Sequence, residues 1–416
     1  MDLYYTLAIL VTLTALFSYI NHKFLGLPVT IGVMLIALIL SLVIILLGML
    51  GFGLEAHAKK VLSQIEFDRT LLHGMLSFLL FAGALHININ DLAAGKWIIG
   101  SLSTVGILLS MFFVGTIVWL ILTVLKIPLS YIYCLLFGAL ISPTDPIAVL
   151  GILKTADAPK SLEIKIAGES LFNDGIGVVA FLILLEITLG THPVSAGYVG
   201  MLFFQEVMGG AVLGSAIGYI AYRMIKSVDN YQVELMITLA LVTGGYALAR
   251  AIHVSGPIAI VLAGLLVGNQ GRLLAMSEKT RDHLDLFWEL IDEILNAVLF
   301  LLIGLEVLVL TFPRYSVLAS LLVIPAVLMV RFVIIGCQVT LLRPIQRFSP
   351  GAIRIMTWAG LRGGISVALA LSLPTGYTRE IILTITYAVV VFSVLVQGLT
   401  IGKVVRKQSM KNKRLK

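Results

Sequence analysis

The chain has 416 residues, of which 59% are hydrophobic and only 12% are charged, and its formal net charge is +7. Soluble domains carry roughly twice that share of charged residues, and a mean hydropathy of +1.05 excludes a soluble protein. Basic residues beside the predicted membrane spans explain the net charge, so no nucleic-acid partner is expected. We therefore expect an all-α integral membrane protein.

Apolar runs of about 20 residues, separated by short polar segments, predict about thirteen transmembrane helices. Residues 1–402 are interpreted as one transmembrane domain, and residues 403–416 as a short basic tail. The spans are expected at residues 2–20, 27–50, 71–90, 97–125, 129–153, 161–190, 196–226, 231–250, 256–270, 285–310, 316–342, 351–373 and 380–402.

Lys and Arg residues predict the orientation of these spans, because cytoplasmic segments of membrane proteins are enriched in both. An odd number of spans places the two termini on opposite sides of the membrane. With the N-terminus outside, most of the 29 basic residues, including those of the tail, fall in cytoplasmic segments. We therefore expect an external N-terminus and a cytoplasmic C-terminus.

The fifth span contains the segment Ser142-Pro143-Thr144-Asp145-Pro146. Each proline lacks an N–H group and disfavours helical geometry in the residue before it. Two prolines so close together predict a broken helix with free carbonyl groups around Thr144, and transporters build ion sites at such breaks. The alternative is a simple proline kink in which Asp145 caps the second half-helix.

The sixth span carries four polar residues within two helical turns. Glu169 and Asn173 share one face, and Ser170 and Asp174 share the adjacent face, because each pair is four residues apart. An ionised carboxyl at the bilayer centre costs about 2.5–3.5 kcal/mol. Two of them in adjacent turns therefore predict pairing, ion coordination or proton transfer.

Three acidic residues, Glu289, Asp292 and Glu293, enter the tenth span. They are interpreted either as a solvated helix start or as a charged funnel that attracts cations. The sequence leaves both interpretations open.

Arg331 lies in the eleventh span between apolar residues. An arginine cannot lose its charge, so it needs a carboxylate partner or must extend to the membrane surface. Glu169 is the expected partner, which would leave Asp174 and Asp145 free to bind and titrate.

The twelfth span is interrupted by glycines around Arg362, in the segment Trp358–Ser366. A glycine-interrupted span in the second half, matching a proline-interrupted one in the first, is typical of two inverted-topology repeats. Arg362 either extends to the surface or neutralises the C-terminal ends of facing half-helices, and a glycine-rich packing face is the alternative.

Several motifs, in the order in which they occur along the chain, resemble those of the monovalent cation:proton antiporters. The similarity is strongest to the branch with the bacterial sodium/proton antiporters and the animal sodium/proton exchangers. The motifs are Ser-Pro-Thr-Asp-Pro at 142–146, Gly-Glu-Ser-Leu-Phe-Asn-Asp-Gly at 168–175, Phe287–Glu306, Arg331, Trp358–Gly364 and Val396–Thr400.

The resemblance implies a thirteen-span homodimer whose broken fifth and twelfth spans cross near the membrane midplane. It implies that Asp174 binds the ion and carries the proton, and that Asp145, Ser170 and the Thr144 carbonyl complete a Na⁺ site. Glu169 and Arg331 match the core ion pair of the family. Asn173 matches a supporting amide and is associated with electroneutral exchange of one cation for one proton.

The function expected from these motifs is exchange of a monovalent cation for H⁺ by alternating access around Asp174. Na⁺ is the expected cation, with Li⁺ or K⁺ as alternatives, and no cofactor is implied. The expected location is a bacterial inner (plasma) membrane, and the expected role is pH homeostasis. The basic tail either touches anionic membrane lipid or is simply solvated.

Two other functional classes were compared with this one. A gated monovalent cation channel or uniporter would use the same acidic site without coupling to protons. An enzyme is not expected, because Phe172 stands where a nucleophile elbow needs glycine and the chain has no His-Glu-x-x-His motif.

Overall fold

The computed structural model describes residues 3–51, 58–60, 62, 67–156, 158–190, 195–310, 313–346 and 348–413. Regular structure in these residues is helical, apart from one isolated bridge between Asp145 and Leu361. The predicted all-α class is therefore confirmed for the described part of the chain. Residue 2 of the first predicted span and residues 414–416 of the predicted tail lie outside it.

In the described residues, the first half of the chain forms the following α-helices and π-helical turns, the latter labelled η. They are α1 (Leu3–Ile20), η1 (Asn21–Leu25), α2 (Val29–Met49), α4 (Phe67–Arg69), η2 (Thr70–Met75), α5 (Leu76–Leu85), α6 (Ile89–Ala94), α7 (Lys96–Ser101), η3 (Leu102–Gly106), α8 (Ile107–Val124), α9 (Tyr131–Ile141), α10 (Ile147–Thr155), α11 (Lys160–Thr188) and α12 (Ala196–Lys226).

The described residues of the second half form further α-helices and π-helical turns. They are α13 (Tyr231–Ala251), α14 (Gly256–Leu266), η4 (Val267–Gly271), α15 (Arg272–Leu274), α16 (Glu278–Glu306), α17 (Arg314–Leu342), α18 (Ala352–Trp358), α19 (Gly364–Leu371), α20 (Tyr377–Phe392), η5 (Ser393–Gln397) and α21 (Gly398–Lys413).

Polar residues cap the beginnings of several long helices. The Ser195 hydroxyl accepts a hydrogen bond from the Tyr198 N–H, and the Ser277 hydroxyl accepts one from the Thr280 N–H. Asn230 caps α13 in the same way through its side-chain oxygen. Such caps satisfy N–H groups that have no partner inside the helix, so these short polar breaks fix where the helices begin.

The helical segments follow the predicted order of thirteen spans. Within the described residues, nine helical segments are long and apolar enough to cross a membrane. The other predicted spans match the shorter helices of Thr70–Leu85, the two halves of the interrupted fifth and twelfth spans, and the charge-rich helix α16.

Three predicted boundaries differ clearly from the structure. The tenth span was expected to begin at residue 285, but α16 begins at Glu278. The third span was expected to reach residue 90, but α5 ends at Leu85 and Asn88 caps the separate short helix α6, because its side chain accepts from two following N–H groups. The tail was expected to begin at residue 403, but α21 runs through Lys413 and buries Val405. The predicted domain boundary therefore falls inside a helix.

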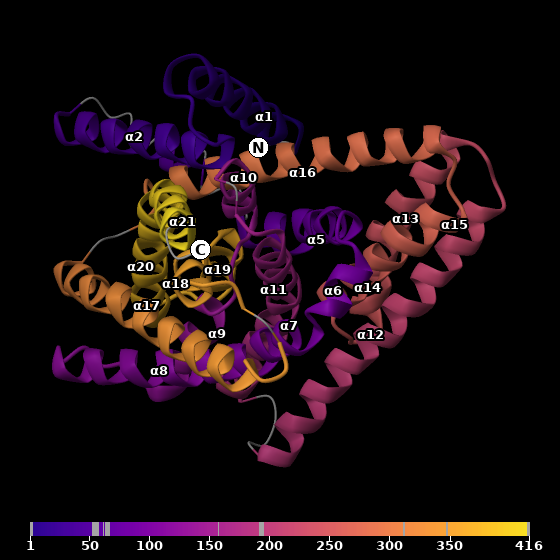
Figure 1. Cartoon of the computed structure of the whole chain (residues 1–416). Helices are drawn as coiled ribbons and strands as arrows, with labels where there is room; N and C mark the ends of the chain where they lie inside the picture. The colour runs from indigo at the N-terminus through magenta and orange to yellow at the C-terminus, as the bar shows by residue number, and fades with distance from the viewer. Residues whose placement is uncertain are drawn as a thin grey trace.

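The interrupted helices lie at the centre of the molecule (Figure 1). There α9 packs against α8 and α11, and α10 packs against α21. On the other side, α12, α13 and α14 pack together, and α16 contacts both α2 and α5. This arrangement surrounds the two breaks with long helices.

Candidate functional site

Two interrupted helices meet backbone to backbone at the centre of the fold. The first break lies between α9 and α10, at residues 142–146, and the second lies between α18 and α19, at residues 359–363. The Asp145 N–H donates a hydrogen bond to the Leu361 carbonyl at 2.8 Å, forming the isolated antiparallel bridge. The expected crossing of the fifth and twelfth spans is therefore present.

Glycines allow this crossing to be tight. A Cβ atom on Gly363 would lie 2.5 Å from Asp145 Oδ2, and one on Gly360 would lie 1.9 Å from Arg331 Nε. On α11, a Cβ atom on Gly177 would lie 2.3 Å from Pro143 Cγ. All three distances are too short for a side-chain carbon, so only glycine fits at these positions in this packing.

Helix α11 is tied to the first break by a buried hydrogen-bond network. The Asn173 side-chain oxygen accepts from the Thr144 N–H at 3.2 Å, and its amide nitrogen donates to the Thr144 hydroxyl at 2.9 Å. The Ser170 hydroxyl lies 3.0 Å from the same Thr144 hydroxyl. The amide of Asn173 thereby replaces the helical partner that the Thr144 N–H loses at the break.

A cavity of about 640 Å³ reaches this crossing. Asp145 and Asp174 are both half-buried and both form part of its wall, beside Pro143 and Gly363. Thr144, Ser170 and Asn173 are buried and bond to one another, and they are not among the lining residues. At the crossing, the cavity wall therefore presents the carboxylates of Asp145 and Asp174, with the hydroxyl and amide groups behind them.

The acidic residues of α16 also line this cavity. Glu289, Asp292 and Glu293 face the same space as Asp145 and Asp174. They do not form a helix start, because α16 begins at Glu278, three turns earlier. Of the two interpretations that the sequence allowed, the location in a cavity wall is the observed one.

Arg331 pairs with Glu169, as expected from the sequence. Its Nη1 lies 3.0 Å from Glu169 Oε1, and its Nη2 donates to the Met356 carbonyl at 3.1 Å. Both side chains are buried. Within the described residues, Glu169 Oε2 has no hydrogen-bond partner. The pair connects α11, α17 and α18 outside the cavity wall.

Arg362 is directed at the end of the opposite half-helix. Its Nη1 donates to the Pro143 carbonyl at 2.8 Å and also to the Ser142 carbonyl. These carbonyls follow α9, where a helix leaves acceptors unpaired and carries partial negative charge. The side chain is only 3% exposed, so Arg362 contacts the facing half-helix and does not extend to the surface.

Sequence reasoning did not identify the polar contacts that hold the second break. The Ser393 hydroxyl accepts from the Arg362 N–H at 2.9 Å and donates to the Gln397 side chain. Gln397 donates to the Trp358 carbonyl at 3.1 Å, and the Trp358 indole donates to Thr400. The Val396–Thr400 motif was the only available signal, and it gave these residues no role.

Asn296 is a second residue that the sequence did not single out. It lines the cavity, is 1% exposed and donates from Nδ2 to both the main-chain carbonyl and the carboxylate of Asp292. Within the described residues its Oδ1 has no hydrogen-bond partner. An oriented, unsatisfied acceptor in a polar cavity wall suits a water molecule or a cation.

Replacing Gly360 by alanine is expected to weaken both folding and function. The new methyl group would overlap the Arg331 guanidinium and push it from Glu169 and Met356, and such overpacking costs about 1–3 kcal/mol. Thermal unfolding of the purified variant would measure the loss. Gly336→Ala is the matched control on α17, because a Cβ atom there has no neighbour within 4 Å; an equal loss in both variants would contradict the steric argument.

Comparisons with known proteins agree with this geometry. A family model described as "Sodium/hydrogen exchanger, transmembrane" matches residues 11–407. The chain is 51% identical over 406 residues to the Na(+)/H(+) antiporter NhaP of Pseudomonas aeruginosa, covering 96% of each chain. It is 34% identical to the Na(+)/H(+) antiporter NhaH of Halobacillus dabanensis, covering 89% of this chain and 91% of that one.

A solved structure shows the same fold. It is that of the sodium proton antiporter MjNhaP1 from Methanocaldococcus jannaschii at pH 8, with a TM-score of 0.76. The sequence identity is 19%, and the match covers 98% of this chain and 99% of that one. At this identity the likeness concerns the fold alone.

Proposed function

The chain belongs to the transmembrane sodium/hydrogen exchanger family, and from this premise we propose that it exchanges Na⁺ for H⁺ at Asp174. It is a membrane transporter of the Na⁺/H⁺ antiporter type. The observation that carries the assignment of the site is the cavity that ends at two crossed, interrupted helices with Asp145 and Asp174 in its wall.

The chemistry of the lining suits an alkali cation. Carboxylate, hydroxyl and carbonyl oxygens are hard ligands, which Na⁺ prefers to nitrogen or sulfur. We assign Na⁺ binding to Asp174, Asp145, Ser170 and the Thr144 carbonyl. In the described conformation the Ser170 hydroxyl bonds to the Thr144 hydroxyl, and the Thr144 carbonyl that we assign as a ligand is a separate acceptor on the same residue.

Exchange follows from competition for one carboxylate. Asp174 holds either a proton or a cation, and each loaded form allows the site to change sides of the membrane. Asn173 holds the Thr144 backbone in place through two hydrogen bonds and adds no charge of its own. We propose that one cation therefore exchanges for one proton and that transport is electroneutral.

The buried arginines are assigned supporting roles. Glu169 and Arg331 neutralise each other and fasten α11 to α17 and α18. Arg362 places positive charge at the carbonyl end of α9. The guanidinium groups of both arginines are therefore bound away from the cavity carboxylates, which stay available to the transported ions.

The cavity is proposed to open to the cytoplasm. Its wall includes Lys160 and Glu163 at the start of α11 and Glu289 in the first half of α16. Both helix starts lie on the side that the distribution of Lys and Arg predicts to be cytoplasmic. We propose an inward-facing conformation, an external N-terminus, a cytoplasmic C-terminus and a bacterial inner membrane. Cysteine labelling of residues in the tail from either side of the membrane tests the orientation.

Transport in proteoliposomes tests the proposed function. With an acidic lumen, external Na⁺, Li⁺ or K⁺ is added while the membrane potential is clamped at zero, and a fluorescent dye reports the internal pH. Cation-dependent alkalinisation is expected, with a rate that does not change when a potential is imposed. Cation flux without proton movement would instead establish the channel or uniporter alternative.

Asp292→Asn is expected to weaken cation entry without stopping exchange. The change removes one negative charge from the cavity wall and alters the carboxylate that orients Asn296, and such charges raise the local cation concentration. We expect a severalfold higher KM for Na⁺ on the cavity side and little change in kcat. Glu278→Gln at the start of α16, outside the lining residues, is the control; equal KM values in both variants would contradict the funnel role.

A homodimer in a lipid membrane is proposed as the assembly. Large apolar side chains such as Leu16, Tyr19 and Val43 are exposed on α1 and α2, and either lipid or a second copy covers such surfaces. Mass determination of the protein in lipid nanodiscs distinguishes the dimer from the monomer.

A further inference from the structure

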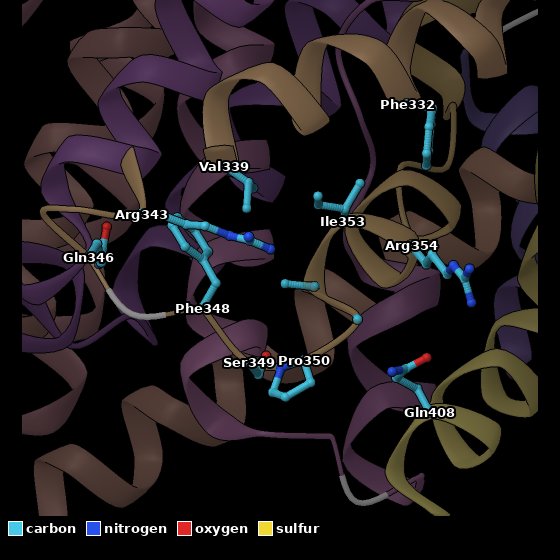
Figure 2. A pocket seen from close by; sticks show the side chains of 12 residues that line it. Phe332, Val339, Arg343, Gln346, Phe348, Ser349, Pro350, Ile353, Arg354 and Gln408 are labelled. Carbon is cyan, nitrogen blue, oxygen red and sulfur yellow. The ribbon is translucent and has the colours of Figure 1, made fainter. Parts of the chain in front are cut away.

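A second cavity, of about 740 Å³, lies at the end of α17, away from the crossed helices (Figure 2). Its walls come from α17, the segment that joins α17 to α18, the beginning of α18, and α21. Six of its lining residues define the candidate site, and they are Phe332, Val339, Arg343, Phe348, Arg354 and Gln408.

The position of the cavity along α17 places it at the membrane boundary. The candidate span ends at Leu342, and Arg343 follows directly. One wall residue, Phe332, is 50% exposed and shares its helix face with the exposed Met329 and Val333. The cavity therefore joins the outer apolar face of α17 to a basic rim at the level of lipid headgroups.

Among the described residues, the two arginines of the basic rim have no carboxylate partner. Arg343 and Arg354 are both exposed, and no carboxylate of the described chain lies within ion-pair distance of either. Figure 2 shows the Arg343 guanidinium directed toward the middle of the cavity, between Val339 and Phe348. The Lys165 ammonium lies 4.5 Å from the Phe348 ring centroid and adds a third positive charge nearby.

We propose that this cavity binds the phosphate headgroup of an anionic phospholipid, with the acyl chains along the outer face of α17. Guanidinium groups present planar pairs of N–H donors that match phosphate oxygens. The apolar wall formed by Phe332, Val339 and Phe348 continues from the headgroup position toward the bilayer. This continuity favours a lipid over a free phosphate ion, which would use only the rim.

An occupied site would connect helices that hold the ion site. Helix α17 carries Arg331, and α18 provides the Met356 carbonyl that Arg331 contacts. On the other side of the cavity, Gln408 of α21 packs directly on Gly351, where a Cβ atom would lie 2.3 Å from the glutamine side chain. Figure 2 shows the Arg343 and Arg354 guanidinium groups on opposite sides of the cavity. A headgroup bound at this rim would thus lie between α17 and α18 beside α21, and we expect it to stabilise the fold.

Thermal unfolding of the full chain in detergent tests the proposal. The probes are a short-chain phosphatidylglycerol, a phosphatidylcholine with the same acyl chains, and inorganic phosphate at the same concentrations. We expect the Tm to rise with phosphatidylglycerol and to change little with the other two. An equal rise with phosphatidylcholine would overturn headgroup recognition, and an equal rise with phosphate would overturn the lipid as occupant.

Variants locate the binding. In Arg343→Gln/Arg354→Gln the half-saturating phosphatidylglycerol concentration is expected to rise at least about tenfold, since each basic residue contributes on the order of 1 kcal/mol to binding anionic lipid. The corresponding double change to lysine should restore most of the affinity. Arg223→Gln, an exposed arginine at the end of α12, is the control. Unchanged affinity in the double glutamine variant, or equal loss in the control, would show that the lipid binds elsewhere.

Discussion

Replacing Asp174 by asparagine is expected to reduce Na⁺-dependent proton movement to the rate of protein-free liposomes. Asparagine has nearly the same shape and still offers one oxygen, but it carries no charge and cannot exchange a proton at working pH. The carboxylate lies in the cavity wall beside the crossed helices. On the proposed mechanism the substitution removes the proton carrier and the main cation ligand together. The dye-based proteoliposome measurement then reports the loss of Na⁺-dependent proton movement.

The control for this variant is Asp282→Asn. Asp282 is exposed on α16 and does not line the cavity, so the change removes one negative charge without touching the site. Its exchange rate should stay near that of the unaltered protein. Asp174→Glu keeps the carboxylate and should retain measurable exchange. Full activity in Asp174→Asn would remove this residue from the mechanism.

Replacing Arg331 by glutamine is expected to cause a large loss of stability. The change leaves Glu169 ionised and buried without its partner, and breaking one side of a buried ion pair costs about 3–5 kcal/mol. The same side chain also holds the Met356 carbonyl of α18. We therefore expect a clearly lower Tm in detergent and reduced transport, because the second interrupted helix loses its attachment to α17.

Two further variants separate the ion pair from other effects. Glu169→Gln/Arg331→Gln removes both charges and should recover much of the lost stability, because an uncompensated buried charge is the main cost. Arg272→Gln breaks the partly exposed pair with Asp285 and should cost about 0–1 kcal/mol. Additive losses from the two single substitutions, without recovery in the double variant, would contradict the pairing argument.

The interrupted helices were predictable because their cause is local. Pro143 and Pro146 act on their own backbone and on the residues before them, wherever the helix lies in the fold. The beginnings of α12 and α13 also have a local cause. The side chains of Ser195 and Asn230 bond to N–H groups two or three residues away. Predicted spans with such boundaries agree closely with the observed helices.

The partner of Arg331 was predictable for a different reason. A permanently charged side chain in an apolar span needs a buried carboxylate, and few are available. By contrast, the sequence could not decide between the two interpretations of Asp292, and it did not predict the contacts of Ser393, because both depend on how distant helices pack. The end of the third span was also missed, because the cap at Asn88 competes with a continuing apolar pattern.

The sequence by itself determined the membrane class, the order of the helices, the two breaks and the buried pair of Glu169 and Arg331. These properties follow from local backbone chemistry and from the cost of placing charge in lipid. Only the tertiary structure decided which groups face the cavity. It brings Asp145 and Asp174 together with Asp292 of α16, turns Thr144 and Ser170 toward each other, and directs Arg362 at the end of α9. Such placement depends on contacts between residues far apart in the chain, which no local pattern encodes.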